Sequence, residues 1–282
     1  MSAFVVTGTD TGIGKTLVSA CLVRAWQADY WKPIQTGLGD EPGDSATVAA
    51  LAEVPPERVH PPRYQLQAPL SPEAAAQLEG VELALDQVVP PRTSRPLVVE
   101  GAGGVLVPIT PTRLMVDLMA QLGLPVVLVA RSTLGTLNHT LLSLEALRAR
   151  ALPIAGVVLS GPLNPGNRAA IERHGRVAVW AELPQLGHLP GAAAVARALP
   201  ELVVLDIMMA EPDDGIEGFV VDDQGLGRVH GLGLGLGDDQ GNGAIRGLGD
   251  HAADRVAEGC ADPPGCDARH GGHATEEAVG DG

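Results

Sequence analysis

Through residues 1–206, short runs of mostly β-branched apolar residues alternate with longer segments whose apolar positions repeat at helical spacing. Several of the short runs are apolar almost throughout, which is typical of strands covered on both faces in a parallel sheet. The predicted strands are residues 3–7, 28–32, 97–100, 126–130, 154–159, 185–188 and 202–205. The predicted helices are residues 15–27, 44–51, 72–79, 112–122, 136–149, 167–175 and 192–198. This alternation predicts an α/β fold, with a doubly wound, mostly parallel sheet and helices on both faces.

Polar residues stand at the ends of several predicted strands. Thr7, Lys32 and Glu100 each close one strand, and a glycine-containing segment follows each of them. The carboxyl ends of parallel strands meet at one edge of the sheet, which is where open α/β sheets bind their ligands. We therefore expect a single site along that edge.

Composition divides the chain near Asp206. Residues 1–206 carry a net charge of −3, whereas residues 207–282 carry −12 and hold 18 of the 36 glycines. The second segment has no sustained apolar period of a strand or a helix, so it cannot bury enough surface to offset its ordering entropy. We expect one folded domain, residues 1–206, followed by an acidic tail, residues 207–282, that is disordered or was never selected to fold. Its charge opposes binding to nucleic acid or anionic membranes.

Other features indicate a soluble, cytoplasmic protein. The chain opens directly on an apolar run without a basic leader, and no stretch of about 20 apolar residues could span a membrane. Of the three cysteines, Cys21 falls in the first predicted helix and is expected to be buried. The spacing of Cys260 and Cys266 matches no metal-binding motif. No structural disulfide is expected.

The segment from Gly8 to Thr16 reads Gly-Thr-Asp-Thr-Gly-Ile-Gly-Lys-Thr and joins the first predicted strand to the first predicted helix. Its spacing, G-x5-G-K-T, is one residue longer than the usual phosphate loop, G-x4-G-K-[ST]. Backbone N–H groups and the start of the helix would hold a phosphate. Lys15 would reach the β- and γ-phosphate oxygens, and the Thr16 hydroxyl would be a ligand of Mg²⁺. The pattern predicts nucleotide binding.

The chain has 17 arginines and only two lysines, Lys15 and Lys32. A lysine ammonium is a compact point charge that a planar guanidinium cannot replace in a tight oxyanion site. Since one of the two lysines stands in the phosphate loop, we interpret their retention as functional rather than as chance.

Two acidic residues are candidates for a metal site. Glu100 ends an apolar strand and precedes Gly101-Ala102-Gly103-Gly104, where the missing side chains let a ligand approach the backbone. A carboxylate in that place, beside a phosphate loop, is suited to bind Mg²⁺. Asp44 has two open interpretations: the N-cap of the second predicted helix, or a third oxygen of the Mg²⁺ site beside Thr16 and Glu100.

Taken together, these motifs resemble the dethiobiotin synthetase family. The resemblance rests on five segments in family order: Val6–Thr16, Lys32-Pro33-Ile34-Gln35-Thr36-Gly37, Gly43-Asp44, Val99–Gly104 and Leu134-Gly135-Thr136-Leu137-Asn138-His139-Thr140. It covers about residues 3–206. It implies a homodimeric ligase of biotin synthesis that depends on ATP and Mg²⁺ and converts 7,8-diaminononanoate and CO2 to dethiobiotin, ADP and phosphate. From the composition and charge described above, no nucleic-acid or membrane partner is expected.

The resemblance also implies roles for individual residues. Lys32, Lys15 and Thr11 would be catalytic, with Lys32 holding the carbamate and γ-phosphate. Thr16, Asp44 and Glu100 would surround Mg²⁺. The nucleotide would contact Gly12, Ile13, Gly14, Lys15, Thr16 and Leu17 through its phosphates, and Ser160, Gly161, Gly187, His188, Leu189 and Pro190 near its base. The substrate would contact Thr36, Gly101 and Gly104, and its remote carboxylate would rest on Gly135, Thr136, Leu137 and Asn138 of the partner subunit.

Ser160 stands where the family commonly has an Asn that binds adenine. A serine hydroxyl makes fewer hydrogen bonds than an amide, so we expect a modest preference for ATP over other nucleotides. In addition, Lys15 and Lys32 are only 17 positions apart, which is consistent with a shortened connection between the first helix and the second strand.

Two other classes of protein share this architecture. Partitioning and septum-site switch ATPases place an extra lysine near the start of the phosphate loop, where this chain has Thr9 and Asp10. A cobyrinate-type synthetase would need a glutaminase domain with a cysteine nucleophile, which residues 207–282 do not provide. The synthetase interpretation alone accounts for Lys32.

Overall fold

The computed structural model describes residues 3–39, 42–183, 219–221 and 227–229. All described elements belong to one compact unit, Met1–Leu232. Its centre is a seven-stranded sheet in the order β11-β10-β9-β1-β6-β2-β4, in which every neighbouring pair is parallel. The strands are β1 (Ala3–Gly8), β2 (Asp29–Trp31), β4 (Val59–His60), β6 (Leu97–Gly104), β9 (Val126–Arg131), β10 (Ile154–Ser160) and β11 (Val179–Leu183).

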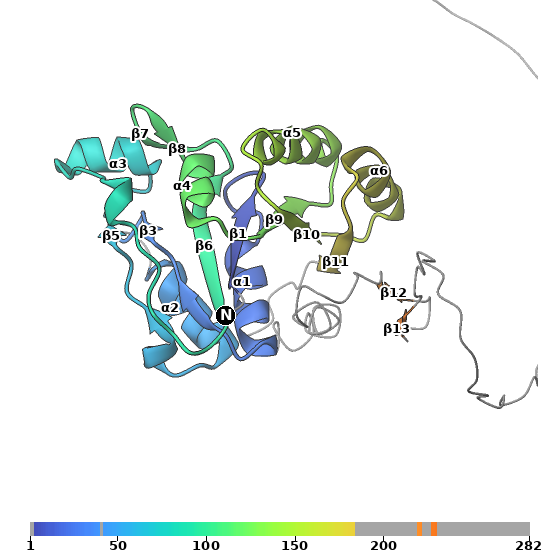
Figure 1. The fold of residues 1–282 in the computed structure, drawn as a ribbon, viewed down its shortest axis with the longest axis horizontal. Helices are drawn as coiled ribbons and strands as arrows, with labels where there is room; N and C mark the ends of the chain where they lie inside the picture. The colour runs from blue at the N-terminus through green and yellow to red at the C-terminus, as the bar shows by residue number, and fades with distance from the viewer. Residues whose placement is uncertain (1–2, 40–41, 184–218, 222–226, 230–282) are drawn as a thin grey trace, which may run out of the picture. The chain divides into compact units, whose positions relative to one another are not determined.

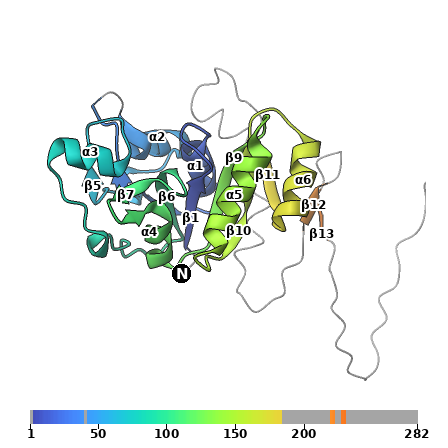
Figure 2. The ribbon, with the colours of Figure 1, turned by 90° about the horizontal axis from the view of Figure 1, so that it is seen from above.

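Helices cover both faces of this sheet (Figures 1 and 2). One face carries α1 (Lys15–Ala25) and α2 (Gly43–Ala52), and the other carries α4 (Met115–Leu122), α5 (Thr136–Arg148) and α6 (Pro165–Gly175). The predicted doubly wound α/β fold is confirmed. The smaller described elements are α3 (Pro72–Glu79), the 3-10 turns Pro56–Arg58 and Leu85–Gln87, and the strand pairs β3 (Ile34–Gln35) with β5 (Tyr64–Gln65), β7 (Pro108–Thr110) with β8 (Arg113–Leu114), and β12 (Phe219–Val221) with β13 (Gly227–Val229).

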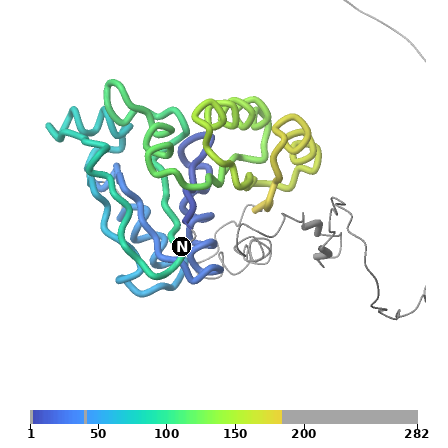
Figure 3. The backbone as a smooth tube through the Cα atoms, viewed as in Figure 1, coloured from blue at the N-terminus to red at the C-terminus, as the bar shows by residue number. Residues whose placement is uncertain are grey.

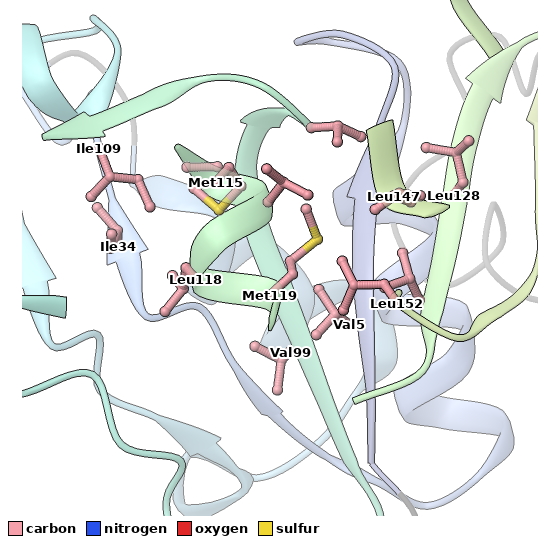
Figure 4. Packing of buried hydrophobic residues seen from close by; sticks show 14 of the residues in the cluster. Val5, Ile34, Val99, Ile109, Met115, Leu118, Met119, Leu128, Leu147 and Leu152 are labelled. Atoms are coloured by element: carbon pink, nitrogen blue, oxygen red, sulfur yellow. The ribbon is translucent and has the colours of Figure 1, made fainter. Parts of the chain in front are cut away.

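Each face of the sheet has its own hydrophobic core, because successive strand residues point to opposite faces. Under α4, the side chains of Leu118 and Met119 pack on Val5 and Val99 of the central strands (Figure 4). Under α1 and α2, a second cluster combines apolar helix residues with alternate strand residues, among them Leu22, Val48, Tyr30 and Val98. Cys21 is fully buried in this second cluster, as expected, and burial raises the pKa of its thiol to about 12.

The path of the chain places a ligand crevice at the end of β1. From β1 the chain first builds the side of the sheet that holds β2, β4 and β6, and only then crosses to β9, β10 and β11 (Figure 3). The chain therefore continues from β6 toward one edge of the sheet and from β9 toward the other edge, so the strand order reverses at β1. Such a reversal of strand order opens a crevice beyond the carboxyl ends of the strands, where ligands bind in open α/β sheets.

Several predicted boundaries need correction. Glu100 does not close its strand, because β6 continues to Gly104, which pairs with Gly8. The fourth helix begins at Met115 rather than at residue 112, because Arg113–Leu114 pairs with Pro108–Thr110. The edge strands β4 and β11 were not predicted, and both are short. The first helix ends at Ala25 and not at residue 27.

Other expectations fall on residues that the structure does not describe. These are the strands predicted at 185–188 and 202–205, the helix at 192–198, and most of the acidic segment 207–282. Within that segment the structure describes only β12 and β13, which pair antiparallel. The domain division at residue 206 stays a prediction. Among the described helices, none is long and apolar enough to cross a membrane.

Candidate active site

A pocket of about 710 Å³ opens at the carboxyl ends of β1, β2 and β6. Both lysines of the chain contribute to its wall, although they come from different elements. The lining residues are Thr11, Gly12, Gly14, Lys15, Thr16, Lys32, Gln35, Thr36, Gly37, Gly43, Asp44, Pro69, Leu70, Ser71, Pro72, Glu100, Ala102, Gly103 and Val107. The single site expected at this edge of the sheet is therefore a cavity large enough for a small-molecule ligand.

The phosphate-loop segment curls over the end of β1 and leads into α1. Gly12 and Gly14 have φ angles of 68° and 96°, in the left-handed region that favours glycine. Gly14 caps α1, so the backbone N–H groups of the first helical turn face the pocket edge without a side-chain cap. The Lys15 ammonium donates to the carbonyl oxygen of Asp10 at 2.8 Å. The loop thus has the geometry of an anion-binding site, and its lysine is hydrogen-bonded to a backbone carbonyl of the same loop.

Lys32 directly follows β2 and lies between two carboxylates. Its Nζ is 2.5 Å from Asp44 Oδ2 and 3.1 Å from Glu100 Oε1. Only 5 % of the Lys32 side chain is exposed, so the ammonium is held by these partners rather than by water. Burial by itself lowers the pKa of Lys32, but the negative charges of Glu100 and Asp44 outweigh it and raise the pKa above its usual value.

The pKa of Lys15 shifts in the opposite direction. Burial lowers it, the positive charge of Lys32 lowers it further, and the nearby carboxylates offset only part of the effect. A cation that is disfavoured in this way gains from the arrival of a polyanion such as a nucleotide phosphate. The two lysines therefore differ in role: Lys32 is already neutralised by its partners, while Lys15 has no direct carboxylate partner among the described residues.

Three side chains whose oxygens could bind a metal ion meet beside Lys32. The Thr16 hydroxyl lies 2.7 Å from Asp44 Oδ1 and 3.1 Å from Glu100 Oε1, so side chains from α1, α2 and β6 meet at one point. Hard oxygen ligands of this kind suit Mg²⁺, which keeps several waters or phosphate oxygens besides one or two carboxylates. No group of three or more His, Cys, Asp or Glu side chains gathers in the described part of the chain, so this site offers two carboxylates and one hydroxyl. The donor set predicted from the sequence is thus compatible with Mg²⁺.

Asp44 is not the N-cap of α2. Pro42 occupies that position, and Asp44 lies in the first turn, where the helix dipole favours a negative charge. Its backbone N–H is bound instead by Gln35 Oε1 at 3.0 Å. Burial raises the pKa of Asp44, but the charge of Lys32 and the hydrogen bonds from Lys32, Thr16 and Gln35 outweigh it and lower the pKa below its usual value. The carboxylate is therefore held ionised and turned toward the pocket.

The predicted residues divide between the pocket wall and its surroundings. Gly101 and Gly104 lie behind the wall: a Cβ on Gly101 would contact Met115, and one on Gly104 would contact the backbone of the phosphate loop. Ile13 is buried in the core under α1, and Leu17 packs against it. Their proposed contacts with the nucleotide and the substrate stay predictions.

The predicted base-binding residues lie beside the phosphate loop. A Cβ on Gly14 would come within 2.9 Å of the Ser160 hydroxyl, so the end of β10 touches the start of α1. A Cβ on Gly161 would come still closer, within 2.5 Å, to the Ser132 hydroxyl. Gly187, His188, Leu189 and Pro190 lie outside the described residues.

The start of α5 does not line the pocket of its own chain. Gly135 and Asn138 are exposed, Leu137 packs partly on the core, and the Thr136 hydroxyl is buried 3.2 Å from that of Thr140. That these residues serve a partner subunit stays a prediction.

Among the residues that hydrogen-bond to Asp44 or Glu100, two were not found by the sequence analysis. Tyr30 donates a hydrogen bond of 3.0 Å from its hydroxyl to Glu100 Oε2, and Gln35 binds the start of α2. Gln35 lies within the quoted Lys32–Gly37 segment, so its position was a usable signal. Tyr30 looked like an ordinary residue of an apolar strand, and only the pairing of β2 with β6 places it against Glu100.

Comparison with known proteins bears on the identity of the chain. A family model described as an AAA domain matches residues 2–193. The ATP-dependent dethiobiotin synthetase of Paramagnetospirillum magneticum is 54 % identical over 200 residues, which cover 71 % of this chain and 95 % of that protein. The chain belongs to the dethiobiotin synthetase family. Dethiobiotin synthetases are ATP-dependent ligases, so the chain is a member of an enzyme family.

Two further relatives agree with this family. The dethiobiotin synthetase of Novosphingobium aromaticivorans is 51 % identical over 201 residues, or 71 % of this chain and 96 % of that protein. A biotin biosynthesis bifunctional protein of Bordetella avium is 62 % identical over 205 residues, and this match spans 73 % of the chain but only 44 % of that longer relative.

The solved structures give a weaker match. The cell division ATPase MinD of Pyrococcus furiosus is 18 % identical, with a TM-score of 0.44 over 74 % of this chain and 100 % of that one. So slight a likeness says nothing about function.

Proposed function

We propose that this chain is a dethiobiotin synthetase, which uses ATP to close the ureido ring of dethiobiotin from 7,8-diaminononanoate and CO2. The observation that carries the proposal is the meeting of the two lysines of the chain in the wall of one pocket, one in the phosphate loop and the other between two carboxylates. A phosphate loop alone serves many ATPases. A second buried cation beside it suits a reaction in which a further anion forms next to the γ-phosphate.

The reaction begins with such an anion. The 7-amino group adds to CO2 and loses a proton, which gives a carbamate with a new negative charge. Lys32 would hold this charge. Two of its three N–H donors go to Asp44 and Glu100, which fix the ammonium at the pocket wall, and the third would go to the carbamate. A preorganised cation in a water-poor site stabilises developing charge without reorganisation.

Phosphoryl transfer and ring closure follow. The carbamate oxygen attacks the γ-phosphorus, ADP leaves, and a carbamic–phosphoric anhydride forms. The 8-amino group then attacks the carbonyl carbon and gives up a proton to water or to the departing phosphate, which leaves with the bonding pair as the five-membered ring closes. No covalent bond to the enzyme is needed, so the residues act by positioning and charge neutralisation. Thr11 and Thr36 line the pocket and would contact the amine, carbamate or phosphate oxygens.

The nucleotide phosphates would lie in the phosphate loop. Their oxygens would replace the Asp10 carbonyl as the partner of Lys15. They would also accept hydrogen bonds from the free backbone N–H groups at the start of α1. Thr16, Asp44 and Glu100 would hold Mg²⁺, which when bound neutralises part of the phosphate charge. Lys32 contacts one oxygen of each carboxylate, Asp44 Oδ2 and Glu100 Oε1. Thr16 lies against the other oxygen of Asp44, Oδ1, and against the same Oε1 of Glu100.

The far end of the substrate would extend to a second copy of the chain. We propose a homodimer in which the start of α5 of one subunit binds the remote carboxylate of the substrate held by the other. Free N–H groups at a helix N-terminus favour an anion, and Gly135 and Asn138 are exposed.

The proposal is tested by making the product. Purified protein is incubated with ATP, Mg²⁺, bicarbonate and 7,8-diaminononanoate, and dethiobiotin is sought by mass spectrometry together with stoichiometric ADP. We expect both products, with ¹³C from labelled bicarbonate in the ureido carbonyl. ATP hydrolysis without dethiobiotin, at a rate unaffected by diaminononanoate, would contradict the proposal and would favour a switch ATPase.

A further inference from the structure

The two carboxylate oxygens of Glu100 have different partners. Oε1 faces the pocket, where it accepts from Lys32 and from Thr16, each at 3.1 Å. Oε2 points into the protein and accepts from the Tyr30 hydroxyl at 3.0 Å. Glu100 is only 1 % exposed and Tyr30 is not exposed at all, so water does not compete for this inner bond.

The sheet register brings Tyr30 and Glu100 together. Tyr30 on β2 pairs with Val98 on β6, and Glu100 lies two residues beyond Val98 on the same face. The tyrosine ring is part of the core under α1 and α2, which fixes its side chain. Its hydroxyl is therefore presented to Glu100 from a rigid position, and it does not itself line the pocket.

The terminal torsion of a glutamate is broad, so packing alone does not decide how its carboxylate plane is turned. In Glu100 the hydroxyl of Tyr30 takes one oxygen and leaves the other for Lys32 and Thr16. Without the hydroxyl, Oε2 would be a buried, charged acceptor with no donor, and the carboxylate would gain by turning toward Lys32 or Thr16 with either oxygen. The orientation of the oxygen that faces the pocket would no longer be unique.

We propose that Tyr30 is a positioning residue. Its hydroxyl fixes the carboxylate of Glu100 so that Oε1 stays directed at Lys32 and at the proposed metal site beside Thr16 and Asp44. The reaction that this geometry supports is taken from the proposed function, whereas the hydrogen bond from Tyr30 to Glu100 is independent of it. Residues that orient a metal-binding carboxylate in this way affect metal affinity and activity by about 10- to 100-fold. Among the described residues, the Tyr30 hydroxyl bonds to Glu100 and not to the phosphate loop, so binding of ATP without metal should be unaffected.

The chain offers a matched control. Its only other tyrosine, Tyr64, is also buried, and its hydroxyl donates to and accepts from the backbone of Ala84 at 3.2 and 3.0 Å. Tyr64→Phe removes a buried hydroxyl with its hydrogen bonds but leaves Glu100 untouched. A general loss of stability would appear in both variants, whereas a positioning effect would appear only in Tyr30→Phe.

The first experiment measures metal binding. Mn²⁺ is titrated into each protein in the presence of a non-hydrolysable ATP analogue and followed by electron paramagnetic resonance. We expect Tyr30→Phe to raise the Kd for Mn²⁺ by about tenfold, while its Kd for the analogue without metal stays within about twofold of the wild type. Tyr64→Phe should leave both constants unchanged. A Kd for Mn²⁺ within twofold of the wild type in Tyr30→Phe, or an equal rise in both variants, would overturn the proposal.

A second experiment needs no change at Tyr30. The protein is labelled with 3-fluorotyrosine, which gives two ¹⁹F resonances that Tyr64→Phe assigns. Adding Mg²⁺ to the complex with the ATP analogue should shift the Tyr30 resonance and leave the Tyr64 resonance in place. A Tyr30 resonance that does not move would overturn the proposal. Neither experiment uses diaminononanoate, so a failure of the proposed ligase activity would not be mistaken for a failure of this inference.

Discussion

Lys32 shows how one residue can combine structural and chemical constraints. Its ammonium is nearly buried, and both of its carboxylate partners come from other elements. The compact head group fits between Asp44 and Glu100, whereas a guanidinium is planar and larger and presents its donors in a fixed fork. The position therefore requires lysine even in a chain with 17 arginines.

Lys32→Arg should lose most of its turnover while keeping its fold. We expect kcat to fall by about 100-fold or more, as when one preorganised charge-stabilising group is removed from an active site. The affinity for an ATP analogue, which depends on the phosphate loop, should change little. Steady-state kinetics and circular dichroism measure these effects. A kcat near that of the wild type would refute the assignment of Lys32.

At the scale of elements, the end of β10 lies against the start of α1. Ser160 closes the strand, and its hydroxyl occupies the space that a side chain at Gly14 would need. The phosphate loop binds any nucleoside triphosphate through its backbone, so discrimination between bases has to come from groups such as Ser160. One hydroxyl offers fewer matched hydrogen bonds than an amide.

We therefore expect only a modest preference for ATP over GTP or CTP, on the order of tenfold, or about 1.4 kcal/mol. Ser160→Asn should increase this preference, because a site with more matched polar groups rejects the wrong base more strongly. The values of kcat/KM for the three nucleotides decide the matter in both proteins. A thousandfold preference in the wild type would show that the base is recognised by other groups.

At the scale of the whole molecule, the charge network around Lys32 couples stability to pH. The raised pKa of Lys32 contributes stability that is complete below its unfolded value of 10.5 and is lost as the pH rises through the higher folded value. The lowered pKa of Asp44 contributes stability above its unfolded value of 3.8, which is lost as the pH falls through the lower folded value. Both contributions are present at neutral pH.

Lys32→Met should reverse part of the dependence of folding stability on pH, so that stability rises as the pH falls. Without the ammonium, the carboxylate of the half-buried Asp44 and that of the buried Glu100 repel each other, so the pair gains from taking up a proton. We expect the variant to be less stable than the wild type at pH 7 and to recover part of the difference as the pH falls from 7 to 4. Urea unfolding at a series of pH values tests this. A deficit that is constant over that range would mean that the carboxylates do not depend on Lys32.

The acidic segment gives a second prediction at this scale. A chain that ends at Asp206 should retain ATP-dependent activity, because residues 207–282 lack the apolar pattern of a core. Its thermal midpoint should lie within about 2 °C of that of the full chain, the shift expected from less than about 1 kcal/mol. The described strands β12 and β13 lie beyond Asp206, so failure of the shortened chain to fold would show that this part of the chain contributes to the domain.

The sequence by itself determined the fold class and the centre of the site. Apolar runs set β1, β6, β9 and β10 to within a few residues, because strands covered on both faces need such runs. The phosphate loop, Lys32 and Glu100 could be found because their chemistry requires particular residue types at the ends or near the ends of strands.

Only the tertiary structure decided how these residues act on one another. Asp44 could be a helix cap or a site residue until the packing of α2 turned its carboxylate toward Lys32 and Thr16. Tyr30 gained a role only through the register of β2 against β6, which no local pattern encodes. The short edge strands β4 and β11 form because neighbouring strands offer unpaired backbone groups. Local sequence specifies which residues are available, whereas pairing and packing over long sequence separations specify which of them meet.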